Sequence, residues 1–260
     1  MKSCKLNLLV SVVLILAMMT ACTGGKTQSD KPLDAVLSDT AQWLLKNTAE
    51  PVYGSVGGEW VAFGFARWGG DVPQEWFDSY YEAVETYVKE CGGVLNDRKY
   101  TEYSRVILAL TAIGKDVTDV GGHDLLAGLN SMDYIQKQGI NGPIWALIAF
   151  DSGNYPIPEG DVTRERLVQV ILDAQLPDGG WALSGDVSDP DMTGMAMQAL
   201  APSYKTNADV KAAVDVALVM LSHTQEEDGG FASIDGTNSE SVAQVLVALT
   251  ACLLTETLSH

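Results

Sequence analysis

The chain has 260 residues, of which 47% are hydrophobic, and it carries 16 Lys and Arg against 34 Asp and Glu. That length and composition predict a globular protein of one large domain or two small ones. The net charge of −18 argues against nucleic acid as a partner, because phosphate binding depends on Lys and Arg that displace counterions. Three histidines and four cysteines without metal-ligand spacing predict no metal cage.

The N-terminus is typical of an export signal. Lys2 and Lys5 precede an apolar run that is short for a membrane-spanning helix, and small residues follow it. The sequence Met19-Thr20-Ala21-Cys22 resembles a bacterial lipoprotein box, although Met19 stands where Leu is more usual. We therefore expect a signal peptide over 1–21 and lipidation of Cys22, which place an exported, extracytoplasmic protein on the cell membrane. Plain secretion, with Cys22 lost or unpaired, is the alternative.

The remaining chain divides into a tether and a repetitive domain. Residues 22–32 are polar and contain glycine, which favours a flexible linker, and residues 33–260 alternate two kinds of helical segment. Amphipathic outer helices with one charged face are expected at 35–47, 76–90, 124–138, 164–175 and 208–223. Short, Ala-rich and nearly uncharged inner helices are expected at 60–68, 103–113, 143–150, 192–201 and 241–252. A helix that is apolar on nearly all sides is buried on nearly all sides, so neighbouring hairpins must stack. Apart from a short ribbon, no strands are expected.

One turn sequence occurs twice in the second half of the chain. It reads Gln-Leu-Pro-Asp-Gly-Gly-Trp over 175–181 and Gln-Glu-Glu-Asp-Gly-Gly-Phe over 225–231. The Gln is expected to bond the backbone of the following turn, the Asp to bond its own downstream backbone, and the glycines to permit the reversal. The aromatic residue is expected to fill the space between hairpins.

These turns resemble the repeats of the terpenoid cyclase and protein prenyltransferase superfamily, and residues 189–200 are similar to one of its inner helices. Bacterial surface proteins with prenyltransferase/squalene oxidase repeats are the most similar, and intrinsic factor and transcobalamin share part of the pattern. The resemblance covers residues 33–252 and implies an all-α fold, the α/α toroid, in which six hairpins close a ring around a cavity. The sequence supplies five hairpins of the six, so an open or incomplete ring is expected.

The resemblance also supplies candidate catalytic residues. Asp191 matches the acid that protonates an alkene in class II terpene cyclases, and Asp189 and Thr193 match the first Asp and the Thr of that motif. Met192 replaces the second neighbouring Asp of the motif. The competing interpretation is that Asp189 or Asp191 caps the following helix, and Glu240 at the equivalent place in the next repeat favours capping. Catalysis is therefore not the preferred interpretation.

We expect ligand binding to involve residues at the inner helices, namely Trp60, Tyr103, Trp145, Asp191 and Glu240. Aromatic faces around a cavity can stabilise a carbocation, whereas the alternative for each aromatic ring is packing in the core. The leading hypothesis is an envelope-anchored module that binds a small apolar or amphipathic ligand, or a surface protein, without catalysis and without a cofactor.

Two enzyme classes remain as alternatives. The first is a terpene-cyclase-like or prenyltransferase-like enzyme with Asp191 as the acid. The second is a carbohydrate-active α/α toroid, which needs two cavity carboxylates, with candidates Glu59, Glu102, Asp191 and Glu240. Protein prenyltransferases hold zinc with an Asp, a Cys and a His, and no Cys stands beside Glu240, so no zinc site is expected. For Cys91 and Cys252, two separate buried thiols are favoured over a disulfide.

Overall fold

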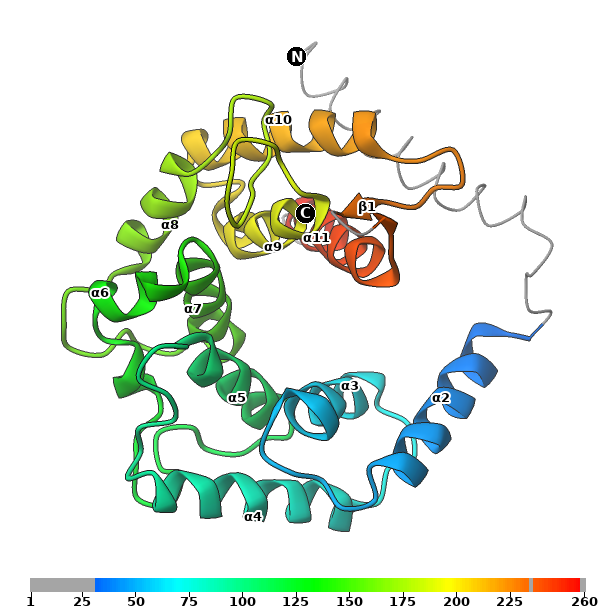
Figure 1. The fold of residues 1–260 in the computed structure, drawn as a ribbon, viewed down its shortest axis with the longest axis vertical. Helices are drawn as coiled ribbons and strands as arrows, with labels where there is room; N and C mark the ends of the chain where they lie inside the picture. The colour runs from blue at the N-terminus through cyan, green and yellow to red at the C-terminus, as the bar shows by residue number, and fades with distance from the viewer. Residues whose placement is uncertain (1–30, 234–235, 258–260) are drawn as a thin grey trace. The chain divides into compact units, whose positions relative to one another are not determined.

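The computed structural model describes residues 31–233 and 236–257 (Figure 1). The expected signal peptide, Cys22 and most of the expected tether therefore lie outside the described residues. The described chain is helical apart from turns and one antiparallel ribbon, in which β1 (Ala232–Ser233) pairs with β2 (Gly236–Thr237). The prediction of an all-α protein is confirmed. No helix in the described ranges is long and apolar enough to cross a lipid bilayer.

The chain forms two compact units, Asp30–Arg164 and Glu165–His260, which we call the first and second unit. In the first unit the inner helices α3, α5 and α7 pack in sequence order, and α4 lies on their outer side (Figure 1). Its helices are α2 (Leu33–Asn47), the irregular turn η1 (Ser55–Glu59), α3 (Trp60–Trp68), α4 (Gln74–Glu90), α5 (Thr101–Ala112), η2 (Leu126–Leu129), α6 (Met132–Ile135), η3 (Gln136–Gln138) and α7 (Asn141–Ser152).

The prediction of one outer helix over 124–138 is wrong, because this segment forms three short helices, η2, α6 and η3. The aromatic ring of Tyr103 presses on η2, since a Cβ on Gly128 would lie 2.2 Å from it. Ser131 then adopts an extended conformation, which ends the first piece. The Oδ1 atom of Asp161 accepts the backbone N–H of Met132 at 2.9 Å and starts the next piece. Tertiary contacts therefore interrupt a sequence whose periodicity favours one helix.

The second unit contains α8 (Arg164–Asp173) from its second residue onward, α9 (Pro190–Leu200), η4 (Ala201–Ser203), α10 (Ala208–Thr224), the ribbon, and α11 (Ser239–Thr257). The inner helices α9 and α11 pack directly on each other. Gly194 allows this close approach, because a Cβ there would lie 2.8 Å from the carbonyl carbon of Gln244. Gln198 adds hydrogen bonds from its Nε2 to the carbonyl oxygen of Gln244 at 3.0 Å and to its Oε1 at 2.7 Å.

Both predicted turns form as expected. The Nε2 of Gln175 donates to the carbonyl of Gly179 at 2.7 Å, and the Nε2 of Gln225 donates to the carbonyl of Gly229 at 3.1 Å. Asp178 and Asp228 each accept the N–H of the residue two positions later. Trp181 and Phe231 are fully buried, so the aromatic residue of each turn fills space inside the unit.

A polar cluster joins α3 to α5 inside the first unit. Glu59 is fully buried at the start of α3, where its Oε2 accepts the Nε of Arg105 at 3.0 Å and its Oε1 accepts the N–H of Gly54 at 2.9 Å. The Nη2 of Arg105 also donates to Oε2 of Glu102 at 2.6 Å, and the hydroxyl of Tyr53 donates to the same oxygen at 3.1 Å. One guanidinium therefore pairs with two carboxylates and fixes α3 against α5.

Tyr80 brings α4 into the same cluster. Its side chain is fully buried, and its hydroxyl has no hydrogen-bond partner among the described residues. Burial, together with the nearby charge of Glu59, raises the pKa of Tyr80, so its hydroxyl is neutral. A buried hydroxyl beside these charges suits a bound water molecule.

The cluster predicts that Arg105→Met lowers the free energy of unfolding by about 3–5 kcal/mol, because the substitution leaves the buried Glu59 carboxylate without its cation. Lys115→Met is the matched control, since Lys115 pairs with Asp78 at the surface and such pairs contribute about 0–1 kcal/mol. Urea unfolding of both variants measures the difference. Equal effects of the two substitutions would show that the cluster does not stabilise the first unit.

Candidate functional site

Trp60 and Trp145 come together in the first unit although they lie far apart in the sequence. Trp60 is the first residue of α3, Trp145 lies on α7, and their ring centroids are 5.6 Å apart. Trp60 is 42% exposed, and Trp145 is half-buried. Two of the predicted binding residues, Trp60 and Trp145, therefore lie together at the surface of the first unit.

Other residues of α3 extend this place along one helix face. Trp60, Phe63 and Arg67 are spaced by three and four residues, so they lie on the same side of the helix. The rings of Trp60 and Phe63 meet edge to face at 6.4 Å, and the Arg67 guanidinium lies 5.5 Å from the centre of the Phe63 ring. We call Trp60, Phe63 and Trp145 the aromatic surface. Arg67 places a cation at its end.

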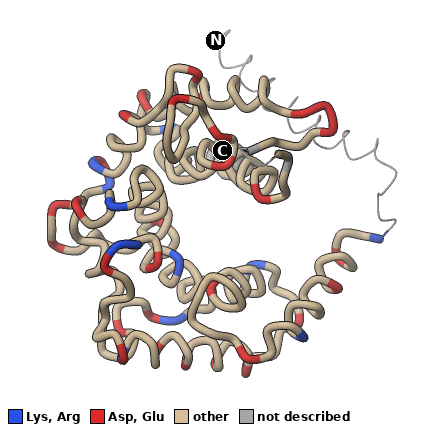
Figure 2. Tube along the Cα trace, in the orientation of Figure 1, with Lys and Arg blue, Asp and Glu red and all other residues tan. Residues whose placement is uncertain are grey.

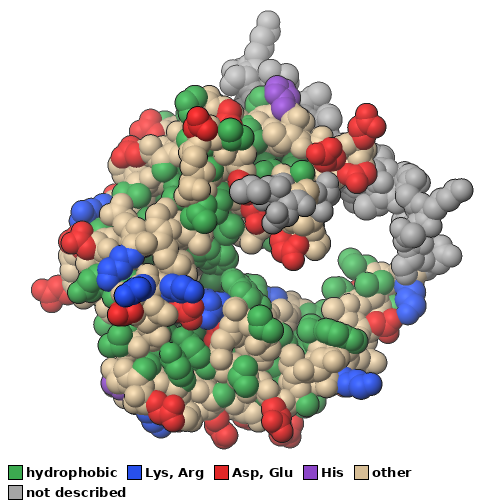
Figure 3. Space-filling model, viewed as in Figure 1, with side chains coloured by type: hydrophobic (Ala, Val, Ile, Leu, Met, Phe, Trp, Pro, Cys, Tyr) green, Lys and Arg blue, Asp and Glu red, His purple; other side chains and the backbone are tan. Residues whose placement is uncertain are grey.

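Gly64 leaves space on the same face. It is exposed, and a Cβ there would meet no atom within 4 Å. Hydrophobic side chains also reach the molecular surface over α2 and α3 in the view of Figure 3. An apolar chain or ring thus finds stacking partners along α3, and a negatively charged head group finds Arg67. The sequence prediction missed Arg67 as a partner of this surface, although its helical spacing from Trp60 and Phe63 was visible.

Tyr103 does not belong to this surface. It is buried in the core, where its hydroxyl donates to the carbonyl of Gly93 at 3.0 Å and accepts the N–H of Leu95 at 3.1 Å. Both hydrogen-bonding roles of the hydroxyl are used within the fold. The expectation that Tyr103 binds a ligand is therefore wrong, because the side chain supports the loop before α5 instead.

The candidate acids of the second unit meet at the start of α9. The N-cap is Asp189, whose Oδ1 accepts the N–H groups of Asp191 at 2.8 Å and Met192 at 3.1 Å. Capping by Asp189 is confirmed, and capping by Asp191 is wrong. Asn238 caps the equivalent point of α11 by accepting the N–H of Ser241 at 2.8 Å, so Glu240 is not the cap there.

Asp191 lies in an acidic cluster with Asp189 and Glu240. It is half-buried, and its Oδ1 is buried without a hydrogen-bond partner among the described residues. Burial raises the pKa of the Asp191 carboxyl, and the charges of Asp189 and Glu240 raise it further. These surroundings make ionisation of Asp191 less favourable than that of an exposed Asp.

Thr193, the third candidate, is fixed within the fold. It is fully buried, and its hydroxyl accepts the backbone N–H of Trp181 at 3.0 Å and donates to the Trp181 carbonyl at 3.3 Å. Thr193 thus connects α9 to the aromatic residue of the first turn. These contacts assign it a structural role rather than a catalytic one.

The carboxylates proposed for glycoside hydrolysis fall into two groups. Glu59 and Glu102 meet at Arg105, but both oxygens of Glu59 are hydrogen-bonded and its side chain is fully buried, so a substrate does not reach it. Asp191 and Glu240 belong to the acidic cluster of the second unit. The first group therefore holds helices together and does not supply an acid and a base.

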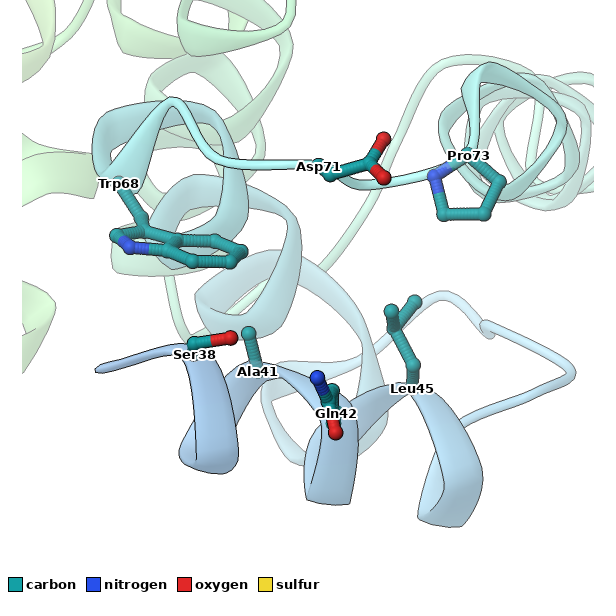
Figure 4. Close-up of a pocket in the computed structure, with 7 residues that line it drawn as sticks. All are labelled: Ser38, Ala41, Gln42, Leu45, Trp68, Asp71 and Pro73. Atoms are coloured by element: carbon teal, nitrogen blue, oxygen red, sulfur yellow. The ribbon is translucent and has the colours of Figure 1, made fainter. Parts of the chain in front are cut away.

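A separate pocket of about 390 Å³ opens beside α2 in the first unit (Figure 4). Its walls are Ser38, Ala41, Gln42, Leu45, Trp68, Asp71 and Pro73. Figure 4 shows the Trp68 ring facing α2, with Asp71 and Pro73 on the loop that follows α3. The volume lies within the range of small-molecule sites, about 300–1,000 Å³. The sequence prediction did not select this site, because loop residues complete it.

Neither a metal site nor a match to a known family indicates which of the aromatic surface, the acidic cluster and the pocket is functional. The described residues contain no group of three or more His, Cys, Asp or Glu side chains that could hold a metal ion. Cys91 is half-buried in the first unit and Cys252 is buried in the second. No protein-family model matches the chain, and no curated protein is similar to it at a significant level.

The acidic cluster predicts opposite effects of substitutions at Asp189 and Asp191. Asp189→Ala removes the cap and should lower the free energy of unfolding by about 0.5–2 kcal/mol. Asp191→Asn should raise it near neutral pH, because the raised pKa in the folded state makes ionisation oppose folding.

The sign of the Asp191 effect fixes its pH dependence. The penalty is absent below the carboxyl pKa of the unfolded chain, grows as the pH rises through the folded pKa, and is then constant. The gain from Asp191→Asn should therefore be present at about pH 7 and vanish near pH 3. Thermal or urea unfolding at both pH values measures it. A loss of stability at neutral pH in the Asn variant would contradict the assignment.

Proposed function

We propose that this protein is an envelope-anchored binding module that takes a small amphipathic ligand on the aromatic surface of its first unit. The proposal includes export, a lipid on Cys22, and membership of the toroid superfamily that the sequence resembles. The observation that carries the binding function is the meeting of Trp60, which is exposed, with Trp145, which is half-buried, from different helices. An exposed indole ring in contact with a second, partly accessible one favours ligand or partner binding.

The surroundings of the aromatic surface support an anionic head group. Arg67 is exposed at the end of the surface, while the whole chain carries a net charge of −18. The overall field repels anions, so a local cation beside the rings gives orientation and selectivity. A ligand with an acyl chain and a carboxylate combines the features that this surface complements.

The ligand experiment uses dodecanoate, with dodecyltrimethylammonium as the probe of opposite charge. Wild-type protein should bind dodecanoate in isothermal titration calorimetry, and Trp60→Ala or Trp145→Ala should weaken binding about tenfold or more, which corresponds to about 1.4 kcal/mol. Arg67→Gln should reduce the preference for the anion over the cation. Trp43→Ala is the matched control, since Trp43 is 62% exposed on α2 and lies outside the surface.

Two results would contradict the proposed location. If Trp68→Ala abolishes dodecanoate binding while Trp60→Ala does not, the ligand occupies the pocket beside α2 instead. If the wild type binds neither amphiphile, the aromatic surface is not a site for this class of ligand.

A second candidate function rests on Asp191. Its Oδ1 is buried without a partner among the described residues, and burial raises the pKa of its carboxyl, which is the direction that an acid protonating an alkene requires. The replacement of the motif's second Asp by Met192 and the structural role of Thr193 speak against it. We therefore rank the cyclase-like enzyme below the binding module.

Product analysis with squalene tests the second candidate. A cyclase would convert the polyprene, and Asp191→Asn would abolish conversion because an amide does not protonate an alkene, while the fold remained intact. Asp189→Asn is the matched control, since Asn caps a helix about as well as Asp and the substitution leaves Asp191 in place. No product from the wild type would remove the enzyme alternative for this substrate.

A further inference from the structure

The pocket beside α2 brings together side chains from two separate elements of the first unit. Four residues of α2 line it at spacings of three, four and seven, so they share one face of the helix. The end of α3 and the loop that follows it form the facing wall (Figure 4). The volume of about 390 Å³ is at the lower end of the range of small-molecule sites, which suits a small ligand.

The loop after α3 holds the Trp68 ring in place as one wall of this pocket. Gly69 ends α3 in the left-handed conformation, with a φ of 69°, and reverses the chain. A Cβ on Gly70 would lie 2.4 Å from Cη2 and Cζ2 of Trp68, so the backbone of the loop lies against the indole. The ring therefore keeps its position through local contacts, and it faces α2 (Figure 4).

The fold does not use the Trp68 ring as a partner for another aromatic ring or for a cation within the described residues. The neighbouring Arg67 lies over the Phe63 ring instead, at 5.5 Å from its centroid. Among aromatic side chains, Trp attracts a cation most strongly to its ring face. The indole of Trp68 is thus available to a ligand.

The polar side chains of the pocket are available as well. Ser38 and Gln42 on α2 and Asp71 on the loop have no hydrogen-bond or ion-pair partner in the described part of the chain. Asp71 is exposed, and its carboxylate is the one charged group among the described residues that line the pocket. A ligand therefore competes only with water for these groups, and the pocket offers it a single negative charge.

We propose that this pocket binds a small organic cation, whose ammonium group contacts the Trp68 ring and the Asp71 carboxylate. The apolar body of such a ligand packs against Ala41, Leu45 and Pro73. The net charge of −18 attracts cations over a longer range. This inference goes beyond the proposed function and does not depend on it, because the aromatic surface is a different site and complements an anion.

The composition of the pocket favours an alkylated ammonium group over a metal ion. A divalent metal ion requires several oxygen ligands, whereas this pocket supplies one carboxylate. An alkylated ammonium group carries its charge inside an apolar shell, so it gains from the indole and from the aliphatic walls together. A hydroxyl on the ligand would find a partner in Ser38 or Gln42.

The test compares choline with 3,3-dimethylbutan-1-ol, its uncharged counterpart of the same shape. Every sample is the full exported chain with Cys22→Ser, so that no lipid is attached, in phosphate buffer without any organic cation. The indole N–H signals of the ¹⁵N-labelled protein follow each titration, and Trp68→Phe identifies the Trp68 signal by its loss. Choline should move this signal and bind about fivefold or more tightly than the alcohol.

Substitutions separate the charge of the pocket from its shape. Asp71→Asn should weaken choline binding about threefold or more and leave binding of the alcohol unchanged, because it removes the charge and keeps the size. Trp68→Leu should weaken choline binding more than binding of the alcohol. Glu82→Gln is the matched control for Asp71, since it removes the same charge from an exposed position on α4 outside the pocket. Trp43→Leu is the control for Trp68.

The same cationic group occurs on free solutes and on lipid head groups, so a second arm uses phosphatidylcholine vesicles. Sedimentation with these vesicles that Asp71→Asn lowers would place the bound cation on a lipid. Choline binding without sedimentation would place it on a free solute. Both results support a cation pocket and identify the source of the ligand.

Three outcomes would overturn the inference. The first is that the wild type binds choline no more tightly than the alcohol. The second is that Glu82→Gln weakens choline binding as much as Asp71→Asn, which would attribute the preference to the overall field of the chain. The third is that Trp60→Ala weakens choline binding and Trp68→Leu does not, which would place the cation on the aromatic surface.

Discussion

The apolar inner helices are the constraint on which both units depend. A helix without a polar face cannot lie at the surface, so α5, α7 and α9 must each be covered on several sides at once. Small residues make the close packing possible. A Cβ on Gly142 would lie 1.8 Å from the carbonyl oxygen of Ile135, which shows that α7 begins in backbone contact with α6. The same requirement explains Gly194 between α9 and α11.

Burial of these helices also brings polar groups into the interior, and the two units accommodate them differently. The first unit pairs the buried Glu59 with Arg105 and shares the same guanidinium with Glu102. Such a cluster costs desolvation, but removal of one member costs more, and so it fixes how α3 meets α5. The second unit relies on neutral hydrogen bonds from Gln175, Gln198 and Thr193 to backbone groups. The many acidic residues instead follow the outer helices and turns (Figure 2).

The same packing produces the candidate sites. Trp60 lies at the start of an inner helix whose Glu59 is locked by Arg105, so the position of the indole is determined by the polar cluster beneath it. Asp191 lies two residues after the cap residue Asp189, and the charges of Asp189 and Glu240 raise the pKa of its carboxyl. Each site is therefore a consequence of stacking hairpins rather than an addition to them.

The sequence by itself determined the helices and their order. Nine of the ten helices predicted from hydrophobic periodicity form, because amphipathic and uniformly apolar segments have different local patterns. The repeated Gln–x–x–Asp–Gly–Gly–aromatic turn was also predictable, because its hydrogen bonds join residues that are close in sequence. Tertiary structure decided what depends on distant residues. It interrupted the helix predicted over 124–138, where the Tyr103 ring contacts Gly128, and it placed Tyr103 in the core. It also determined that Asp189 caps α9 and that Asp191 is partly buried. Periodicity shows which face of a helix is apolar. Only packing determines which neighbour covers that face, and hence which rings remain exposed and which carboxyls lose water.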